Sequence, residues 1–332
     1  MTSTAVESGA ETSSEVSAPA VPLAARTRGL RKVYGSTVAV DHVDLDIPQG
    51  AVVGMLGPNG SGKTTTIRML LGLVRPTEGE VELLGRSMPD AAAHALPDVG
   101  ALVEGPGFHP FLSGRDNLLR FAAAEPRLAS AGISAAVDTA LERVGLTGAA
   151  RRRYKGYSLG MKQRLGLASA LLVPRKMVVL DEPTNGLDPA GTREIRRIVA
   201  ELHAEGVTVL VSSHLLAEVE ATCTHVAVLQ AGNVVAQGEL AELLESGNAA
   251  LLVRTPDADL AVEVLRENRI GARLTPDGVR ADLTATEAPR VLRVLVGAGV
   301  AVHEATRART GLEDLFARLT ESSVDGSSGG TE

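Results

Sequence analysis

A glycine-rich octapeptide, Gly57–Thr64, has the residue types needed to hold phosphate groups. It reads Gly-Pro-Asn-Gly-Ser-Gly-Lys-Thr and fits the pattern G-x-x-x-x-G-K-[ST]. In such a loop the backbone N–H groups and the positive end of the following helix attract an anion, the lysine neutralises the outer phosphates, and the last hydroxyl reaches Mg²⁺. The segment therefore predicts a site for a nucleoside triphosphate and its magnesium ion. The residues predicted to contact the nucleotide are Gly57, Pro58, Asn59, Gly60, Ser61, Gly62, Lys63, Thr64 and Thr65.

A pair of adjacent carboxylates, Asp181 and Glu182, follows the short apolar run at 177–180. Open α/β sheets bind their ligands at the carboxyl ends of their strands. We expect Asp181 to reach the Mg²⁺ that Thr64 coordinates. We expect Glu182, which points the other way, to polarise a water molecule in line with the γ-phosphate. The pair therefore predicts hydrolysis of the nucleotide, and the alternative is a solvated strand end.

A histidine, His214, ends the next apolar run, which spans 207–211 and leads into Ser-Ser-His. An imidazole at the carboxyl end of a strand in this kind of sheet can hydrogen-bond a γ-phosphate oxygen and the attacking water. We predict a catalytic role for His214 together with Glu182 and Lys63. A polar cap on the strand is the alternative.

These candidates need strands and helices that bring them together. Residues 51–56 read as a buried strand, and 65–73 carry apolar residues at helical spacing, so the glycine-rich loop joins a strand to a helix. The runs at 177–180 and 207–211 do not alternate, which is typical of buried parallel strands. The sequence thus predicts an α/β core whose functional side chains meet at one edge.

Two further segments flank this core. Residues 38–47 alternate between apolar and polar types, as half-buried antiparallel strands do, so a small β layer precedes the core. From about 88 to 156 the chain becomes Ala-rich and helix-like, which predicts a helical insertion.

The pattern changes again after residue 248, where the sequence predicts a small α+β domain at 249–320. Its expected elements are a strand at 251–255, a helix at 259–266, a hairpin around 276–278, a helix at 287–296, a strand at 300–305 and a helix at 311–319. Residues 1–21 and 321–332 are rich in small and polar residues, and we expect disordered tails there.

Composition excludes several classes of protein. The chain has 332 residues and 44% hydrophobic content, enough for a large core. A net charge of −7 and 2% aromatic residues argue against nucleic acid as a partner. One cysteine excludes an internal disulfide, and the histidines lack metal-ligand spacing. No apolar run approaches ~18 residues and the start is acidic, so we expect the protein to stay in the cytoplasm.

Together these motifs resemble the ATP-binding subunit of an ABC transporter, a P-loop NTPase cassette with a RecA-like core. The resemblance rests on the order and spacing of the glycine-rich loop, the acidic strand, the turn at 185–189, Ser-Ser-His, and the segment Tyr-Ser-Leu-Gly-Met-Lys-Gln-Arg at 157–164. It covers residues 22–246, with the helical insertion at about 88–165. It implies ATP and Mg²⁺ as cofactors.

The resemblance also implies roles for residues outside the loop. Two copies, or one copy and a related ATPase, dimerise head to tail in this family. The segment containing Ser158 and Gly160 then caps the ATP of the other copy, although an ordinary N-capped helix is the alternative for Ser158. Asp188 would belong to the turn that links the two ATP sites. Tyr34 would stack on adenine, with core packing as its alternative.

The sequence departs from the family pattern at two places. The signature usually reads Leu-Ser-Gly-Gly-Gln, whereas Leu159 and Met161 replace the first glycine and the glutamine. Glu104 stands where the family has glutamine, and the resemblance implies that it ligates Mg²⁺ or orients water. Both departures resemble the ATPases of antibiotic and lantibiotic self-protection exporters of the bacitracin- and daunorubicin-resistance type. The segments 108–118 and 311–316 resemble the same branch.

This branch implies a partner and a location. The partner is an integral membrane permease that exports an antibiotic, a lantibiotic or another drug-like compound, and the ATPase is cytoplasmic and peripheral on the inner face of the cell membrane. We expect Phe108 and Phe111 to form part of the docking groove, with core packing as the alternative.

Two questions stay open at this stage. A soluble ABC-type ATPase of translation or DNA maintenance is the alternative function, and the single phosphate loop and the lack of sustained heptads disfavour it. The C-terminal α+β pattern does not distinguish a ligand sensor from a support for the dimer.

Overall fold

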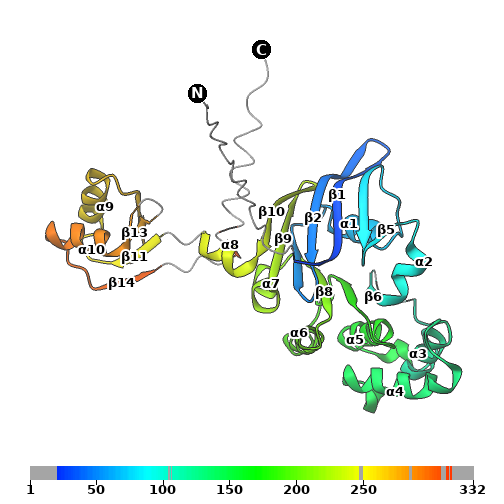
Figure 1. Cartoon of the computed structure of the whole chain (residues 1–332). Coiled ribbons are helices and arrows are strands. Elements are labelled where there is room, and N and C mark those ends of the chain that lie inside the picture. Colours follow the sequence, from blue (N-terminus) through cyan, green and yellow to red (C-terminus); the bar gives the residue numbers. More distant parts are fainter. Residues whose placement is uncertain are drawn as a thin grey trace, which may run out of the picture.

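The computed structural model describes residues 21–103, 105, 107–246, 250–283, 286–307, 312, 313 and 315. The tails predicted at 1–21 and 321–332, except residue 21, lie outside the described residues, as does most of the helix predicted at 311–319. The strands that the structure describes form three sheets (Figure 1).

The central sheet has six strands in the order β10-β9-β3-β8-β7-β6, and every neighbouring pair is parallel except β10 with β9. The strands are β3 (Val52–Leu56), β6 (Val99–Leu102), β7 (Met177–Asp181), β8 (Thr208–Ser213), β9 (His225–Gln230) and β10 (Asn233–Glu239). All five residues of β3 are buried. A strand with both faces covered does not need to alternate apolar and polar residues, which is why the apolar runs predicted β3, β7 and β8.

An antiparallel sheet covers one face of the central sheet. Its order is β2-β1-β4-β5, built from β1 (Leu23–Tyr34), β2 (Thr37–Pro48), β4 (Glu78–Leu83) and β5 (Arg86–Met88). Leu45 and Ile47 of β2 lie in one buried cluster with Met55 of β3 and Val179 of β7. The predicted antiparallel β layer is therefore confirmed, and it packs through alternate side chains of β2.

Helices cover the other face of the central sheet and extend beyond it (Figure 1). The helices of the described residues are α1 (Lys63–Leu70), α2 (Ala92–Ala95), α3 (Gly114–Ala123), α4 (Ile133–Arg143), α5 (Leu159–Ala170), α6 (Pro189–Ala204), α7 (Leu216–Thr222), α8 (Leu240–Ser246), α9 (Ala258–Glu267) and α10 (Ala288–Gly297). Short 3₁₀ turns occur at Leu96–Asp98, Ser130–Gly132, Thr147–Ala149 and Tyr154–Gly156. Within the described residues, every helix is too short or too polar to cross a membrane.

The helical stretch predicted from 88 to 156 includes a strand. Val99–Leu102 pairs with β7, so the longer helices of this stretch begin only at Gly114. Leu118 of α3 and Leu141 of α4 share a buried cluster with Leu165 of α5. The helices therefore rest on α5, which links them to the central sheet.

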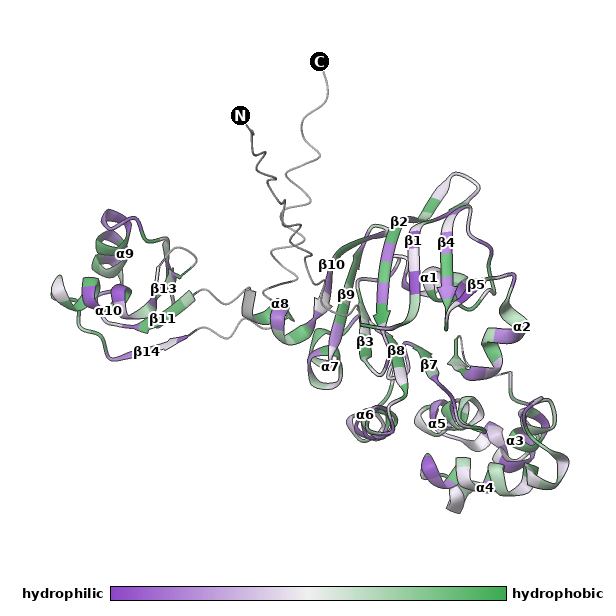
Figure 2. Ribbon diagram, in the orientation of Figure 1, coloured by the Kyte–Doolittle hydropathy of each residue, from purple (hydrophilic) through white to green (hydrophobic). Residues whose placement is uncertain are grey.

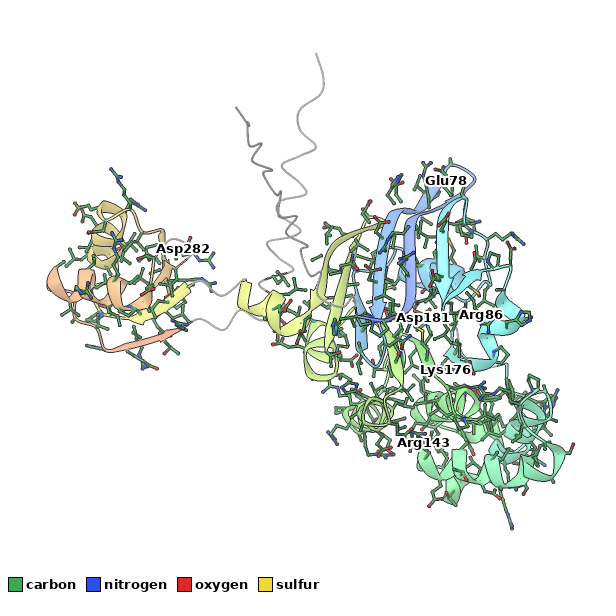
Figure 3. All side chains as sticks on the ribbon, in the orientation of Figure 1. Glu78, Arg86, Arg143, Lys176, Asp181 and Asp282 are labelled. Atoms are coloured by element: carbon green, nitrogen blue, oxygen red, sulfur yellow. The ribbon has the colours of Figure 1, made fainter. Side chains whose placement is uncertain are left out.

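Ion pairs also join the helical stretch to the core. Lys176 Nζ lies 2.9 Å from Asp98 Oδ2, and Arg143 Nη2 lies 2.5 Å from Glu205 Oε1 (Figure 3). Contacts with Lys176 and Arg127 keep the pKa of the Asp98 carboxyl below its usual range.

A nearly buried ion pair, Arg175 with Glu125, ties the segment after α3 to the start of β7. The side chains are 7% and 10% exposed, and Arg175 Nη2 lies 2.7 Å from Glu125 Oε2. Arg175 also donates to the carbonyl oxygens of Pro97 and Ala170 at 2.6 and 3.1 Å. The guanidinium therefore binds two backbone carbonyl groups as well as the carboxylate.

Glu125→Ala is expected to lower the free energy of unfolding by about 3–5 kcal/mol, because it leaves the Arg175 charge buried without its partner. Urea unfolding measures the change. Asp90→Ala is the matched control, since Asp90 pairs with Arg75 but both side chains are more than 70% exposed, and an exposed pair contributes at most about 1 kcal/mol. Equal losses in the two variants would contradict the expected role of burial.

The C-terminal unit is a separate antiparallel sheet with two helices. Its strands β11 (Ala250–Arg254), β12 (Ala272–Thr275), β13 (Gly278–Asp282) and β14 (Glu304–Arg307) have the order β12-β13-β11-β14. Figure 2 shows hydrophobic and hydrophilic residues alternating around α9 and α10, which bury Leu265 and Leu295 against Val253 and Val279. The β-α-β-β-α-β order is the ferredoxin-like arrangement.

The predicted hairpin around 276–278 is confirmed by the pairing of β12 with β13. The strand predicted at 300–305 is displaced, because pairing with β11 begins only at Glu304. All four residues of β14 are exposed, so the strand has no apolar pattern, whereas the buried Val300 belongs to the segment before it.

Two leucines beyond the C-terminal unit pack on the central sheet. Leu312 and Leu315 are 0% and 9% exposed and share a cluster with Leu56 at the end of β3 and with Val226 and Val228 of β9. The chain thus returns from the C-terminal unit to the sheet edge that it leaves through α8.

Candidate functional site

The glycine-rich loop connects β3 to α1 and has no room for larger residues at its ends. A Cβ on Gly57 would lie 2.3 Å from the carbonyl oxygen of Leu229, and Gly62 has a φ of 98° and would approach the carbonyl oxygen of Ala39 to 2.7 Å. Helix α1 begins at Lys63 immediately after the loop. The backbone N–H groups at this helix start are available for an anion.

Two polar side chains of the loop are buried in it. Lys63 is 5% exposed, and its Nζ donates to the carbonyl oxygens of Gly57 at 2.7 Å and Pro58 at 3.2 Å. Ser61 Oγ is buried without a hydrogen-bond partner in the part of the chain that the structure describes. A buried hydroxyl without a partner is rare in folded proteins unless a ligand or water completes it. The loop therefore fits a phosphate group.

The pairing of the strands brings the predicted residues to one edge of the sheet. Leu56 lies opposite Ser213, and Asp181 lies opposite Ser212. The glycine-rich loop, the acidic pair and the histidine turn consequently leave the sheet side by side. This is the edge at which open parallel sheets bind ligands.

Asp181 is held by hydroxyl groups on both sides. Thr64 Oγ1 donates to its Oδ2 at 2.9 Å, and Ser212 Oγ donates to its Oδ1 at 2.6 Å. Ser212 Oγ in turn accepts the backbone N–H of Glu182 at 2.8 Å. The structure thus brings Thr64 and Asp181 together, as the sequence predicted, and adds Ser212, to which sequence reasoning gave no role. The oxygen atoms of Thr64 and Asp181 suit a hard cation such as Mg²⁺.

Glu182 lies between Lys63 and His214. Its Oε1 is 3.4 Å from Lys63 Nζ, and its Oε2 is 2.8 Å from His214 Nδ1. The backbone of Glu182 is left-handed, with a φ of 47°. That conformation is unfavourable for a residue with a Cβ. The three residues predicted to be catalytic therefore meet in one place.

The segment with Ser158 and Gly160 begins α5. Ser158 Oγ accepts the backbone N–H of Met161 at 3.3 Å, so this residue is the helix N-cap, and both Ser158 and Leu159 are exposed. Asp188 caps α6 in the same way, accepting the N–H of Gly191 at 2.8 Å. Within one chain these side chains act as helix caps. Because they are exposed, they are also accessible for the predicted contacts with a second chain.

The exposure of the aromatic candidates decides between their predicted contacts and core packing. Tyr34 is 46% exposed, and Lys32 Nζ lies 5.1 Å above its ring, so core packing is wrong for Tyr34. Phe108 is only 8% exposed and packs edge-on against Phe121 and Tyr154, so it belongs to the core and not to a docking surface. Burial depends on how α3 folds back over the loop, which local sequence does not reveal. Phe111 is 62% exposed.

Glu104, predicted as a Mg²⁺ ligand, lies outside the described residues.

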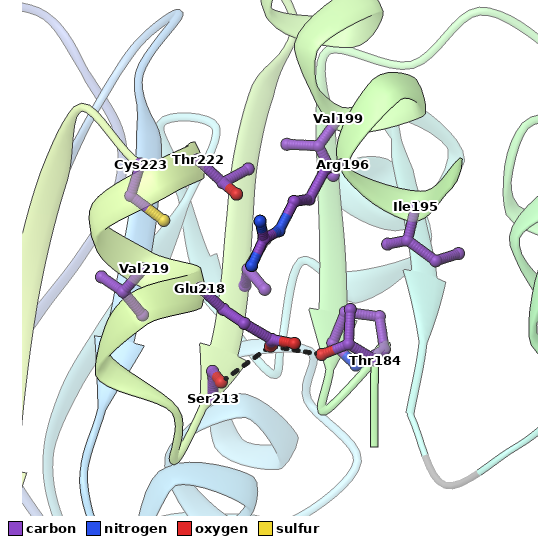
Figure 4. Close-up of a pocket in the computed structure, with 11 residues that line it drawn as sticks. Thr184, Ile195, Arg196, Val199, Ser213, Glu218, Val219, Thr222 and Cys223 are labelled. Atoms are coloured by element: carbon purple, nitrogen blue, oxygen red, sulfur yellow. Dashed lines mark hydrogen bonds between the residues drawn. The ribbon is translucent and has the colours of Figure 1, made fainter. Parts of the chain in front are cut away.

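Behind the acidic turn lies a cavity of about 20 Å³, lined by residues from the turn at 183–184 and from α6, β8 and α7 (Figure 4). Cys223, the single cysteine of the chain, lies on its wall, and burial raises the pKa of the thiol to about 12. This thiol is therefore protonated and unreactive at neutral pH.

Comparison with known proteins gives a consistent result. The family model described as ABC transporter matches residues 40–185. The uncharacterized ABC transporter ATP-binding protein YhcH of Bacillus subtilis (strain 168) is 39% identical over 87% of this chain and 93% of its own length. The bacitracin transport ATP-binding protein BcrA of Bacillus licheniformis is 38% identical over 89% of this chain and 96% of its own length. Among solved structures, the ADP conformation of the ABC transporter cassette MJ1267 has a TM-score of 0.59 at 26% identity, covering 67% of this chain and 92% of that one.

Proposed function

Because this chain belongs to the ATP-binding proteins of ABC transporters, we propose that it binds and hydrolyses ATP to drive a separate membrane exporter of an antibiotic or a similar compound. The observation that carries the ATPase part is the contact of Glu182 with both Lys63 and His214 beside the glycine-rich loop. The bacitracin transport relative, which aligns over nearly its whole length, supports the exporter part.

Glu182 is the base in this proposal. Its carboxylate accepts the proton of the attacking water, while His214 keeps one carboxylate oxygen fixed and Lys63 provides positive charge for the phosphate oxygens. Lys63 donates to carbonyl groups of its own loop. Phosphate oxygens carry negative charge, so ATP would offer the Lys63 ammonium stronger acceptors than these neutral carbonyl groups.

Thr64 and Asp181 are the proposed Mg²⁺ ligands, with Glu104 as a further ligand or a water-orienting group. The bound cation would neutralise charge on the β- and γ-phosphate oxygens. Ser212 holds Asp181 in place by its hydrogen bond to Oδ1. Tyr34 would stack on the adenine ring of ATP. The residues of the loop from Gly57 to Thr65 would surround its phosphate groups.

We propose residues 22–246 as the ATPase domain and 249–320 as an accessory domain, whose closing residues Leu312 and Leu315 pack back on the sheet of the ATPase domain. Two ATPase domains would meet head to tail, with Ser158, Gly160 and the start of α5 facing the ATP of the other copy and Asp188 at the turn between the sites. The exposed, capped start of a 12-residue helix supports this, because its backbone N–H groups favour an anion. The partner copy is the same chain or a related ATPase.

The proposed location is the inner face of the cell membrane, where a permease subunit would bind the loop before α3. Phe111 is the candidate anchor, since its exposed ring lies against the Lys155 ammonium at 5.2 Å. Exposed aromatic side chains that become buried in a complex supply much of the binding free energy.

Purification of the Glu182→Gln protein with ATP from membranes of its own cell tests the exporter proposal. We expect a membrane protein with several spanning helices to copurify, and Phe111→Ala to reduce its recovery about tenfold or more, as loss of an interface anchor does. Leu73→Ala is the control, because Leu73 is equally exposed, at 62%. Recovery of ribosomal or DNA-bound proteins alone would overturn the exporter proposal and leave the ATPase proposal intact.

A further inference from the structure

Glu218, in the first turn of α7, joins the two loops that carry Glu182 and His214. Its Oε2 accepts a hydrogen bond from Thr184 Oγ1 at 2.5 Å and a longer one from Ser213 Oγ at 3.3 Å. Thr184 comes shortly after Glu182, and Ser213 directly precedes His214. Figure 4 shows both hydrogen bonds converging on the Glu218 carboxylate.

Each of the two hydroxyl groups belongs to a turn that a hydrogen bond of its own closes. Ser213 is 2% exposed, and its Oγ accepts the N–H of Leu215 at 3.0 Å, which sets the turn that carries His214. Thr184 belongs to a tight turn in which the N–H of Asn185 donates to the carbonyl oxygen of Glu182 at 3.2 Å. A movement of Glu218 would therefore move both turns.

The surroundings of Glu218 make these hydrogen bonds strong. Glu218 and Thr184 are half-buried, and the adjoining cavity of about 20 Å³ has room for about one water molecule. Its walls include the apolar side chains of Ile195, Val199 and Val219. Hydrogen bonds to a carboxylate are strengthened where little water competes for it.

The catalytic pair needs such support. Glu182 lies outside the regular part of β7 and has an unfavourable positive φ, and the His214 side chain is one-third exposed. Ser212 fixes the backbone N–H of Glu182, but this bond does not reach the turn that follows. The direct contact between the two residues, Glu182 Oε2 to His214 Nδ1, spans turns from different strands.

We propose that Glu218 is a positioning residue for ATP hydrolysis: through Thr184 and Ser213 it holds the Glu182 and His214 turns at the separation that their contact requires. Glu218 itself does not reach the nucleotide loop, so its effect is on turnover and not on ATP binding. This inference rests on the proposed ATPase function.

The test uses the full chain and steady-state ATP hydrolysis with matched substitutions. Thr184→Val keeps the shape and removes the hydroxyl, and Glu218→Leu removes the acceptor. We expect each to lower kcat about 10- to 100-fold, since a misplaced catalytic group can cost about 100-fold, while KM for ATP changes less than about twofold. Thr184→Ser and Glu218→Gln keep a donor and an acceptor, and we expect both within about threefold of the unchanged protein.

A double variant separates positioning from a general loss of structure. Thr184→Val with Glu218→Leu should lower kcat little more than either change alone, because both remove the same hydrogen bond. Three outcomes would each overturn the inference. The losses in kcat of the two single variants could multiply in the double variant, or KM could rise as kcat falls. Thr184→Ser could also have a kcat no higher than that of Thr184→Val. If the protein without any substitution does not hydrolyse ATP, the proposed function is overturned instead. The two failures are therefore distinguishable.

Discussion

Glu182→Gln is expected to lower ATP turnover at least about 100-fold, the lower end of the effect of general base catalysis, while ATP binding is retained. The amide keeps the size of the side chain and a hydrogen bond to His214 but does not accept the proton of water. Because binding depends on the loop at 57–65, the affinity for ATP should change little. In the proposed dimer the variant should also accumulate as a closed, ATP-bound pair of chains.

Phosphate release at saturating ATP, ATP binding and size-exclusion chromatography with ATP measure these three outcomes. Glu220→Gln is the control, since Glu220 is an exposed carboxylate of α7, and we expect normal turnover. A Glu182→Gln protein with near-normal turnover would remove Glu182 as the base. Loss of ATP binding would show that its carboxylate serves the loop and not the chemical step.

Lys63→Ala is expected to abolish ATP binding at micromolar concentrations. Lys63 is the buried cation of the loop, and its removal also leaves the Glu182 carboxylate, 3.4 Å from Nζ, without this neighbouring charge beside the phosphate site. Truncating one partner of a buried charge pair costs about 2–5 kcal/mol, and every 1.4 kcal/mol is about tenfold in Kd. We therefore expect Kd for ATP to rise about 100-fold or more.

Calorimetric titration with ATP and Mg²⁺ measures this change. Lys176→Ala removes an ammonium that is 70% exposed and pairs with Asp98 away from the loop, and it should bind ATP normally. Unchanged affinity in Lys63→Ala would mean that the backbone of the loop and the helix terminus suffice for binding. The lysine would then act only in the reaction.

The parts of the site that could be predicted from sequence are those whose chemistry lies in contiguous residues. The loop from Gly57 to Thr64 has its function in its own backbone, and Asp181 and Glu182 follow a strand that its apolar run identifies. The α/β fold with its antiparallel layer followed from the period of the apolar residues, because burial on one or both faces determines that period.

The parts that could not be predicted depend on contacts between distant segments. Ser212 acquires its role from strand register, since it lies opposite Asp181. Glu218 contacts Thr184 only because α7 packs beside the turn after β7. Phe108 is enclosed by Phe121 of α3 and by Tyr154, and the local sequence did not decide between this packing and a docking role. A local pattern contains no signal for such contacts.

The two leucines that follow the C-terminal unit make that unit an inserted loop of the cassette and not a removable extension. Leu312 and Leu315 close the chain onto the cluster formed by Leu56, Val226 and Val228, so the unit is tethered at both ends to one side of the sheet. A chain cut short at residue 246 would therefore expose an apolar strip to water, and loss of activity in such a truncation would not by itself prove a regulatory role for the missing unit.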